Sequence, residues 1–137
     1  MSTHLSSSPI TEDEWLRSVG DALDLTGWAW IHPRPARRAQ GKWTTPTQGN
    51  SAKGFPDIVA VRPPRVLWLE LKTERGRVSP EQDDWLERLR TSGQEAYVIR
   101  LPRDWQFFTE LTARDPEQLT LTSNSTAAVF VAADDRR

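Results

Sequence analysis

The spacing of apolar residues changes along the chain between a helical period and an extended one. From Thr11 to Gly27, apolar residues recur every three or four positions, which predicts a first helix. Thr11 and Glu14 have the spacing of a capping box, which marks the start of that helix. A further helical pattern spans residues 104–111. Short apolar runs that are typical of strands occur at residues 28–32, 58–61, 66–71 and 96–99.

Another helix is expected to begin after Ser79. Serine is a good N-cap, Pro80 suits the first helical position, and Gln82 completes a capping box. The strand at residues 96–99 follows the strand at residues 66–72 through this helical crossover, so the two strands are expected to pair in parallel. The pattern therefore predicts an α/β fold with a mixed sheet.

The strands at residues 58–61 and 66–71 are separated by Arg-Pro-Pro-Arg, which predicts a hairpin because proline cannot donate to a central ladder. With the turn centred between the two prolines, Asp57 lies opposite Glu70 on one face of the sheet. Primed two-residue turns need positive φ, which proline cannot adopt, so we expect a four-residue loop over residues 62–65 that keeps this register. A slip of one residue would send the two acids to opposite faces.

Two carboxylates that face each other across a hairpin repel, so a positive charge is needed beside them. Lys72 follows Glu70 by two positions, and strand alternation places its ammonium group on the same face. One lysine balances only part of the charge of Asp57 and Glu70. A divalent cation such as Mg²⁺, which binds carboxylate, water and phosphate oxygens, would balance the rest. The alternative is that both acids are ordinary solvated charges at strand ends.

The composition bounds the class of protein. The 137 residues are 36% hydrophobic, which suits a single domain over residues 1–137 with a modest core. We expect residues 1–9 to be flexible and residues 113–137 to form a C-terminal extension to which no function is assigned. The absence of cysteine excludes disulfides and thiolate zinc sites, and with two histidines a metal would be bound by oxygen. No apolar run reaches the roughly 18 residues of a membrane span, so a soluble intracellular protein without membrane contact is expected.

The net charge of −1 does not favour a general nucleic-acid-binding protein. The distribution of charge is more informative, because residues 33–54 hold five cations and no acid. Segments of this length between elements are usually functional or disordered, and a basic face is able to steer a polyanion such as a nucleic acid. The alternative is a solvated basic loop with Trp43 packed beneath it. The candidate DNA-binding residues are Arg34, Arg37, Arg38, Lys42 and Lys53.

Three motifs surround the candidate site: Gly-Phe-Pro-Asp at residues 54–57, Glu-Leu-Lys-Thr-Glu at residues 70–74, and Gly-Arg-Val-Ser-Pro-Glu-Gln at residues 76–82. They closely resemble the VRR-NUC family of the PD-(D/E)xK nuclease superfamily, in particular its short standalone members from phages and bacteria. The likeness spans about Thr11 to Trp105. It implies a restriction endonuclease-like core of helix, strand, hairpin, helix and strand, with helices flanking a mixed central sheet. It also implies a Mg²⁺- or Mn²⁺-dependent enzyme that hydrolyses phosphodiester bonds in DNA.

The resemblance also implies roles for individual residues. Asp57 and Glu70 are expected to hold the metal together with the backbone carbonyl of Leu71. Lys72 is expected to orient or deprotonate the attacking water, or to balance negative charge. Gln82 lies on the apolar side of its helix, where it either bonds back to the helix terminus or lies at the edge of the metal site. The expected catalytic residues are thus Asp57, Glu70, Lys72 and Gln82.

Glu12 is the candidate for a further metal ligand. A helical projection places Glu12 close to the apolar face and Glu14 far from it. Many members of the superfamily take a metal-site carboxylate from the first helix, and by resemblance this role falls on Glu12. The alternative, equally favoured, is that Glu12 complements the helix dipole at the N-terminus.

The family resemblance favours an endonuclease that recognises DNA structure, such as a Holliday junction or another branched DNA. Resolvase activity would suit a homodimer with two sites, in the cytoplasm of a bacterium or a phage-infected cell. A nuclease that cuts ordinary duplex or single-stranded DNA is the first alternative. The second is a nucleic-acid-binding module without catalysis, in which the acid cluster is structural.

Overall fold

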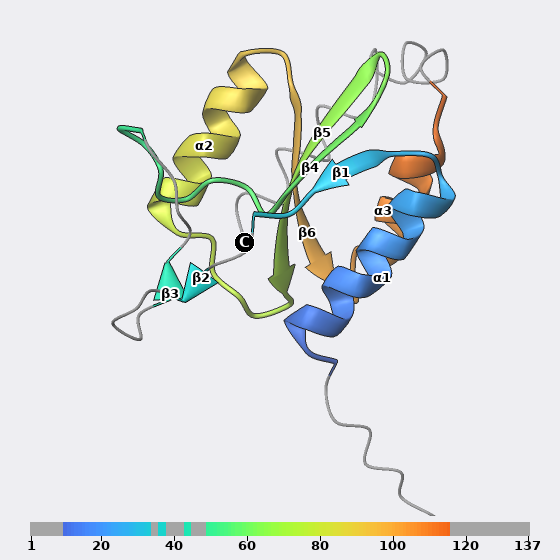
Figure 1. The fold of residues 1–137 in the computed structure, drawn as a ribbon, viewed down its shortest axis with the longest axis horizontal. Coiled ribbons are helices and arrows are strands. Elements are labelled where there is room, and N and C mark those ends of the chain that lie inside the picture. Colours follow the sequence, from blue (N-terminus) through green and yellow to red (C-terminus); the bar gives the residue numbers. More distant parts are fainter. Residues whose placement is uncertain (1–9, 34–35, 38–42, 45–48, 116–137) are drawn as a thin grey trace, which may run out of the picture.

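The computed structural model describes residues 10–33, 36–37, 43–44 and 49–115, and the structural statements below refer to these residues. Helix α1 (Glu12–Leu25) is followed by strand β1 (Ala29–Ile31), by the short strands β2 (Ala36–Arg37) and β3 (Trp43–Thr44), and by the hairpin strands β4 (Ile58–Arg62) and β5 (Arg65–Thr73). Helix α2 (Pro80–Thr91), strand β6 (Glu95–Leu101) and helix α3 (Trp105–Ala113) follow (Figure 1). This order confirms the expected helix, strand, hairpin, helix and strand. Residues 1–9 and most of the proposed C-terminal extension lie outside the described residues.

The main sheet is mixed, as predicted. Its strand order is β1-β4-β5-β6, in which β1 and β5 run antiparallel to β4, and β6 runs parallel to β5. Strands β2 and β3 form a separate two-stranded sheet within the segment that the sequence analysis treats as a loop. Helices α1 and α3 lie on one side of the main sheet and α2 lies on the other, which gives three layers (Figure 1).

Both predicted capping boxes are present. The Thr11 side chain accepts from the Glu14 N–H, and the Glu14 carboxylate accepts from the Thr11 N–H. Ser79 and Gln82 make the same reciprocal pair at the start of α2. These caps fix where α1 and α2 begin, because each satisfies backbone donors that the helix leaves free. Within the described part of the chain, no helix has the length and apolar character needed to cross a membrane.

The register of β4 and β5 is the one that places the two candidate acids together. Ile58 pairs with Leu69, and the register continues in single steps toward the turn. Extended by one residue beyond the strand, it sets Asp57 opposite Glu70. The sequence prediction of the register is therefore confirmed.

The turn of this hairpin differs from the expected four-residue loop. Arg62 and Arg65 form the last pair of the ladder, and only Pro63 and Pro64, joined by a cis peptide bond, make the turn. The two arginines stay in the ladder because their guanidinium groups donate to main-chain carbonyls of α3. Both groups also lie over the ring of Trp28, at 4.8 and 5.1 Å from its centroid.

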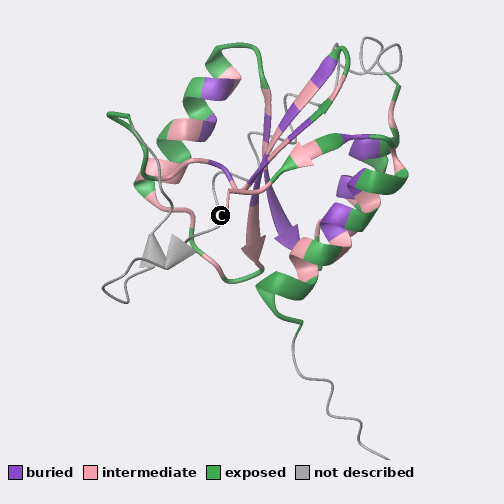
Figure 2. Cartoon of the chain, viewed as in Figure 1, coloured by how far each residue is buried: buried purple, intermediate pink, exposed green. Residues whose placement is uncertain are grey.

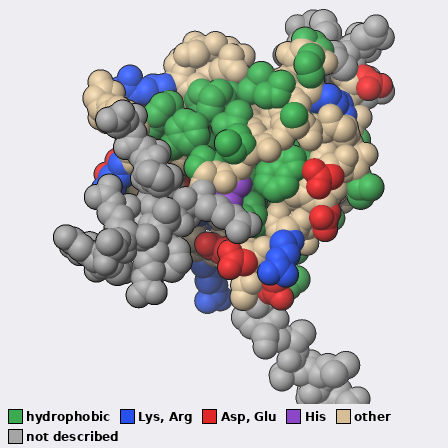
Figure 3. Space-filling view, viewed as in Figure 1, with side chains coloured by type: hydrophobic (Ala, Val, Ile, Leu, Met, Phe, Trp, Pro, Cys, Tyr) green, Lys and Arg blue, Asp and Glu red, His purple; other side chains and the backbone are tan. Residues whose placement is uncertain are grey.

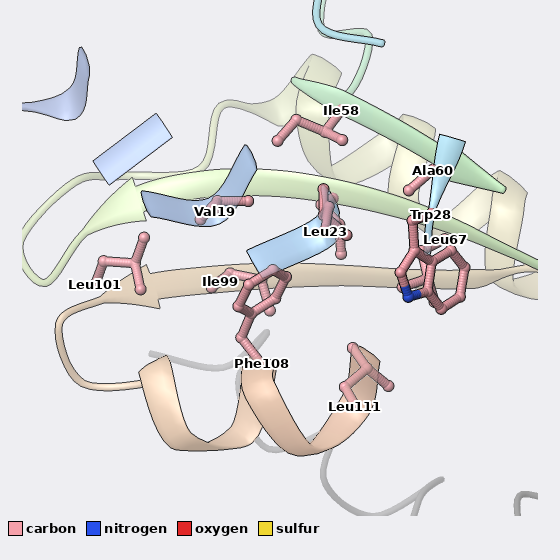
Figure 4. Close-up of a cluster of buried hydrophobic side chains, with 11 residues drawn as sticks. Val19, Leu23, Trp28, Ile58, Ala60, Leu67, Ile99, Leu101, Phe108 and Leu111 are labelled. Carbon is pink, nitrogen blue, oxygen red and sulfur yellow. The ribbon is translucent and has the colours of Figure 1, made fainter. Parts of the chain in front are cut away.

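The larger core lies between the sheet and helices α1 and α3 (Figure 4). Strand alternation sends Leu67 and Leu69 of β5 into this core and turns Trp68 and Glu70 toward α2. Figure 2 shows buried positions concentrated in the central strands and on the inner sides of the helices. The buried residues of this core are Val19, Leu23, Trp28, Ile58, Ala60, Leu67, Leu69, Ile99, Leu101, Phe108 and Leu111.

A smaller core lies under α2, where Leu86 and Leu89 pack against residues of β6. This helix leaves the outer half of the same sheet face open, so Ile31 of β1 is 61% exposed and Val61 of β4 is 38% exposed. Figure 3 shows apolar side chains gathered on this part of the surface. Among the described residues, α2 covers the part of this face formed by β5 and β6, which is where Glu70 lies.

Leu23→Ala is expected to destabilise the fold much more than Leu25→Ala. Leu23 is fully buried, whereas Leu25 of the same helix is 88% exposed. Loss of a buried side chain removes transfer free energy and leaves a cavity, so we expect about 2–5 kcal/mol less free energy of unfolding for Leu23→Ala. For Leu25→Ala we expect a change within about 0.5 kcal/mol. Urea unfolding measures both, and equal losses would contradict the assigned inner face of α1.

Candidate active site

Two carboxylates and a lysine come together at one end of the hairpin. Strand β5 carries Glu70 and Lys72 with their side chains on the same side, and Lys72 Nζ lies 3.5 Å from Glu70 Oε1. The segment that leads into β4 brings the Asp57 carboxylate close enough to interact with that of Glu70. The structure therefore brings together the three residues that the hairpin register predicts.

Glu70 is the most buried member of the group, with 2% of its surface exposed. Its Oε1 accepts a hydrogen bond from Gln82 Nε2 at 2.6 Å and faces the Lys72 ammonium group. Its Oε2 is buried and has no hydrogen-bond partner among the described residues. Buried polar atoms are nearly always paired, so an unpaired carboxylate oxygen next to a second carboxylate is a candidate ligand for a cation.

Burial, followed by the neighbouring charge of Asp57, raises the pKa of Glu70 to about 8 against the opposing effect of Lys72. The cause is that a carboxylate in a dry environment beside another carboxylate is costly to ionise. At neutral pH the metal-free pair therefore holds a proton on Glu70. A bound cation would replace this proton.

Asp57 is held by its neighbours in the sheet. Its Oδ2 accepts a hydrogen bond from the Leu71 N–H of β5 at 2.8 Å. Its backbone carbonyl lies 2.6 Å from Nδ1 of His32, the residue that follows β1. Asp57 is thus fixed between the two strands that flank β4, with one carboxylate oxygen bonded to the backbone.

Gln82 makes both of the contacts that the sequence offers as alternatives, one with its own helix terminus and one with the carboxylate pair. Its Oε1 accepts from the Ser79 N–H at 2.9 Å, which closes the capping box of α2. Its Nε2 donates to Glu70 at 2.6 Å. One amide therefore fixes the start of α2 and fixes the buried carboxylate, so the position of the helix and that of Glu70 are linked.

Gly54 lets the loop before Asp57 approach α2 closely. Its φ is +84°, a conformation that side chains disfavour. A Cβ atom at this position would lie 2.5 Å from the carbonyl carbon of Glu81 and 2.7 Å from the backbone nitrogen of Gln82. Only glycine fits here, and this contact brings the loop that carries Asp57 against the helix that carries Gln82.

A pocket opens beside Asp57 and Lys72, between α1 and the end of β5, and Glu70 lies outside its lining. Glu12 and Asp13 of α1 line it together with His32, Asp57 and Lys72. Glu12 is exposed, and no three Asp, Glu or His side chains of the described ranges lie close enough to hold one ion. Glu12 thus faces the pocket without joining the carboxylate pair, and its role as a ligand stays a prediction.

The structure describes few of the candidate DNA-binding residues. Arg34, Arg38 and Lys42 lie outside the described residues, and Arg37 lies in β2. Lys53 is described, and its ammonium group lies 3.0 Å from Glu81 in an exposed ion pair. The structure thus leaves the role of the basic segment as a prediction.

The local spacing of residues does not predict two further contacts near the site. Nδ1 of His32 lies 2.6 Å from the backbone carbonyl of Asp57. Arg100 is 5% exposed and donates to the carbonyls of Thr73 and Gly76, which holds the loop between β5 and α2. Both contacts join segments far apart in the chain, and no local motif signals them.

A family model and a solved structure are each similar to part of this chain. A family model described as the VRR-NUC domain matches residues 32–101, slightly more than half of the chain. Among solved structures, Hjc of Archaeoglobus fulgidus, a Holliday junction resolvase from an archaeal hyperthermophile, is similar, with 27% sequence identity and a TM-score of 0.42. That likeness covers 64% of this chain and 66% of the resolvase chain, just under two thirds of its length. No curated protein matches the chain.

The mixed sheet, its element order and the matched family give the chain the restriction endonuclease-like fold that its motifs imply. The chain belongs to the VRR-NUC domain family. The resemblance that its three motifs carry is thereby confirmed, and the matched segment contains Asp57, Glu70, Lys72 and Gln82.

The stability of the metal-free chain is expected to fall as the pH rises from about 5 to 9. Glu70 keeps its proton to a higher pH in the folded chain than its ordinary value of 4.5, so the folded state binds more protons across this window. Glu70→Gln removes this contribution and should flatten the pH dependence. Urea unfolding in a chelator at pH 5, 7 and 9 measures the difference between the two proteins. Parallel profiles would contradict a raised pKa for Glu70.

Gly54→Ala is expected to destabilise the chain more than Gly93→Ala. Both glycines have a φ near +80°, but an added Cβ meets the backbone of α2 at Gly54 and nothing within 4 Å at Gly93. Gly93→Ala therefore measures the backbone strain alone, about 1 kcal/mol, and overpacking should add about 1–3 kcal/mol for Gly54→Ala. Urea unfolding gives both values. A loss for Gly54→Ala no larger than that for Gly93→Ala would disprove the close approach.

Proposed function

We propose that this chain is a metal-dependent DNA endonuclease that hydrolyses phosphodiester bonds at the site formed by Asp57, Glu70 and Lys72. The observation that supports the proposal most directly is the buried Glu70 carboxylate. One of its oxygens has no partner in the part of the chain that the structure describes, although a second carboxylate lies beside it. Buried polar atoms are usually paired, so an unpaired carboxylate oxygen beside a second carboxylate favours a bound cation.

The donor set fits Mg²⁺ or Mn²⁺. The carboxylates of Asp57 and Glu70 and the main-chain carbonyl of Leu71 are hard oxygen donors, which these ions prefer. Glu12, which lines the same pocket, is the proposed further carboxylate. A cation bound by these groups would neutralise charge on the phosphate and activate water for attack.

Lys72 is the proposed partner of the attacking water. The Lys72 side chain is 17% exposed and lines the pocket, and its ammonium group lies 3.5 Å from Glu70 Oε1. From there it would orient the water or balance the negative charge that develops on the phosphate. Gln82 would hold the Glu70 carboxylate in place through its hydrogen bond.

DNA is the proposed substrate, and branched DNA such as a Holliday junction is the form that the family resemblance favours. We further propose a homodimer, because two sites are needed to cut a junction in two strands. The five cations of the basic segment, Arg34, Arg37, Arg38, Lys42 and Lys53, are the proposed phosphate contacts.

Asp57→Asn and Lys72→Ala are expected to abolish most of the cleavage. Asn cannot replace the charge that holds the cation, and Ala removes the group that faces the water, so we expect a loss of about 10²–10³-fold or more in rate for each. Cleavage of a four-way junction, a linear duplex and single-stranded DNA at equal salt, with Mg²⁺ or with a chelator, measures the activity and the substrate preference.

Glu110→Gln provides the control for these variants, because Glu110 is exposed on α3, outside the residues that line the pocket. It should cleave like the unchanged protein. Equal cleavage by all variants would show that Asp57 and Lys72 are not catalytic. DNA binding without turnover, strengthened by Asp57→Asn, would instead indicate a binding module, and a preference for linear DNA would remove the junction proposal alone.

A further inference from the structure

His32 is the first residue after the ladder between β1 and β4 ends. The last pair of that ladder is Ile31 with Val59, so Asp57 lies beyond the reach of the β1 backbone. The side chain of His32 takes over at this point, with its Nδ1 2.6 Å from the Asp57 carbonyl oxygen. A carbonyl oxygen only accepts hydrogen bonds, so Nδ1 carries the proton in this contact.

The contact acts on Asp57 from the side opposite to β5. Leu71 of β5 donates to the Asp57 carboxylate at 2.8 Å, whereas His32 bonds the main chain of the same residue. Asp57 precedes β4 and follows the loop that starts at Gly54, so few ladder bonds fix its position. The contact with His32 holds the backbone of Asp57, and the contact with Leu71 orients its carboxylate.

We propose that His32 is a positioning residue that acts through Asp57. It holds the backbone from which the Asp57 carboxylate reaches the cation, so the affinity for the metal and the rate of the chemical step depend on it. This inference rests on the proposed function. Partners that orient metal ligands typically contribute about 10–100-fold in metal affinity or activity.

The other ring nitrogen offers a competing role. Within the described ranges, Nε2 of His32 has no hydrogen-bond partner, and the half-buried ring lines the pocket. A direct contact of Nε2 with the nucleic acid would also make His32 important. The two roles use different ends of the ring, so they are separable by substitution.

Substitution of His32 by Asn or by Gln distinguishes the role of Nδ1 from that of Nε2. The amide nitrogen of Asn is two bonds from Cβ, like Nδ1 of histidine, and that of Gln is three bonds away, like Nε2. His32→Asn therefore keeps a donor for the Asp57 carbonyl, whereas His32→Gln keeps a polar group at the pocket and His32→Ala removes both.

The test measures Mn²⁺ affinity by electron paramagnetic resonance, and kcat and KM on junction DNA, for the full chain and the three variants. Positioning predicts that His32→Ala and His32→Gln weaken Mn²⁺ binding and lower kcat by about 10–100-fold. KM should change little, because the contact with DNA is not altered. His32→Asn should restore both the affinity and kcat to near the values of the unchanged protein.

Several results would overturn the proposal. His32→Asn as impaired as His32→Ala, or His32→Gln as active as the unchanged protein, would reject positioning through Nδ1. A raised KM with unchanged Mn²⁺ affinity would assign His32 to the nucleic acid instead. If the unchanged protein neither binds Mn²⁺ nor cleaves DNA, the proposed function fails first and the role of His32 falls with it. Urea unfolding of each variant identifies a loss that comes from the fold alone.

Discussion

Burial of the Glu70 carboxylate beside Asp57 is the constraint on which the rest of this structure depends. Two like charges in a dry site are stable only if a proton or a cation compensates them. The chain supplies part of the compensation through Lys72 and Gln82, which both reach one oxygen of Glu70. The other oxygen lacks a partner among the residues described, and stability alone does not explain such an arrangement.

The fold holds this costly group by linking separate elements to it. The alternation of β5 directs Glu70 toward α2, and the glutamine that caps α2 bonds Glu70 in return. Gly54 brings the loop before Asp57 against the same helix terminus. His32 then fixes Asp57 from the side of β1. The geometry of the site therefore depends on how β1, β5 and α2 are held relative to one another.

Much of this arrangement follows from local rules. The apolar runs and the Pro-Pro turn were enough to set the hairpin register, because a shift by one residue would expose the core face of both strands. The capping boxes could also be predicted from the sequence, since each involves residues three positions apart. The predicted length of the turn was wrong, because hydrogen bonds to α3, which is distant in sequence, keep Arg62 and Arg65 in the ladder. The hydrogen bond from Gln82 to Glu70 and the contact of His32 with Asp57 join separate elements, and no spacing along the chain encodes them.

Proton release on metal binding tests the central claim most directly. Calorimetric titration with Mn²⁺ at pH 7, in two buffers of different ionisation enthalpy, gives the number of protons released for each bound ion. Because the pKa of Glu70 is raised to about 8, a cation at the Asp57–Glu70 pair should displace close to one proton. Glu70→Gln should bind more weakly and release none. Tight binding without proton release, or unchanged binding and release in Glu70→Gln, would contradict a metal site built on the buried carboxylate.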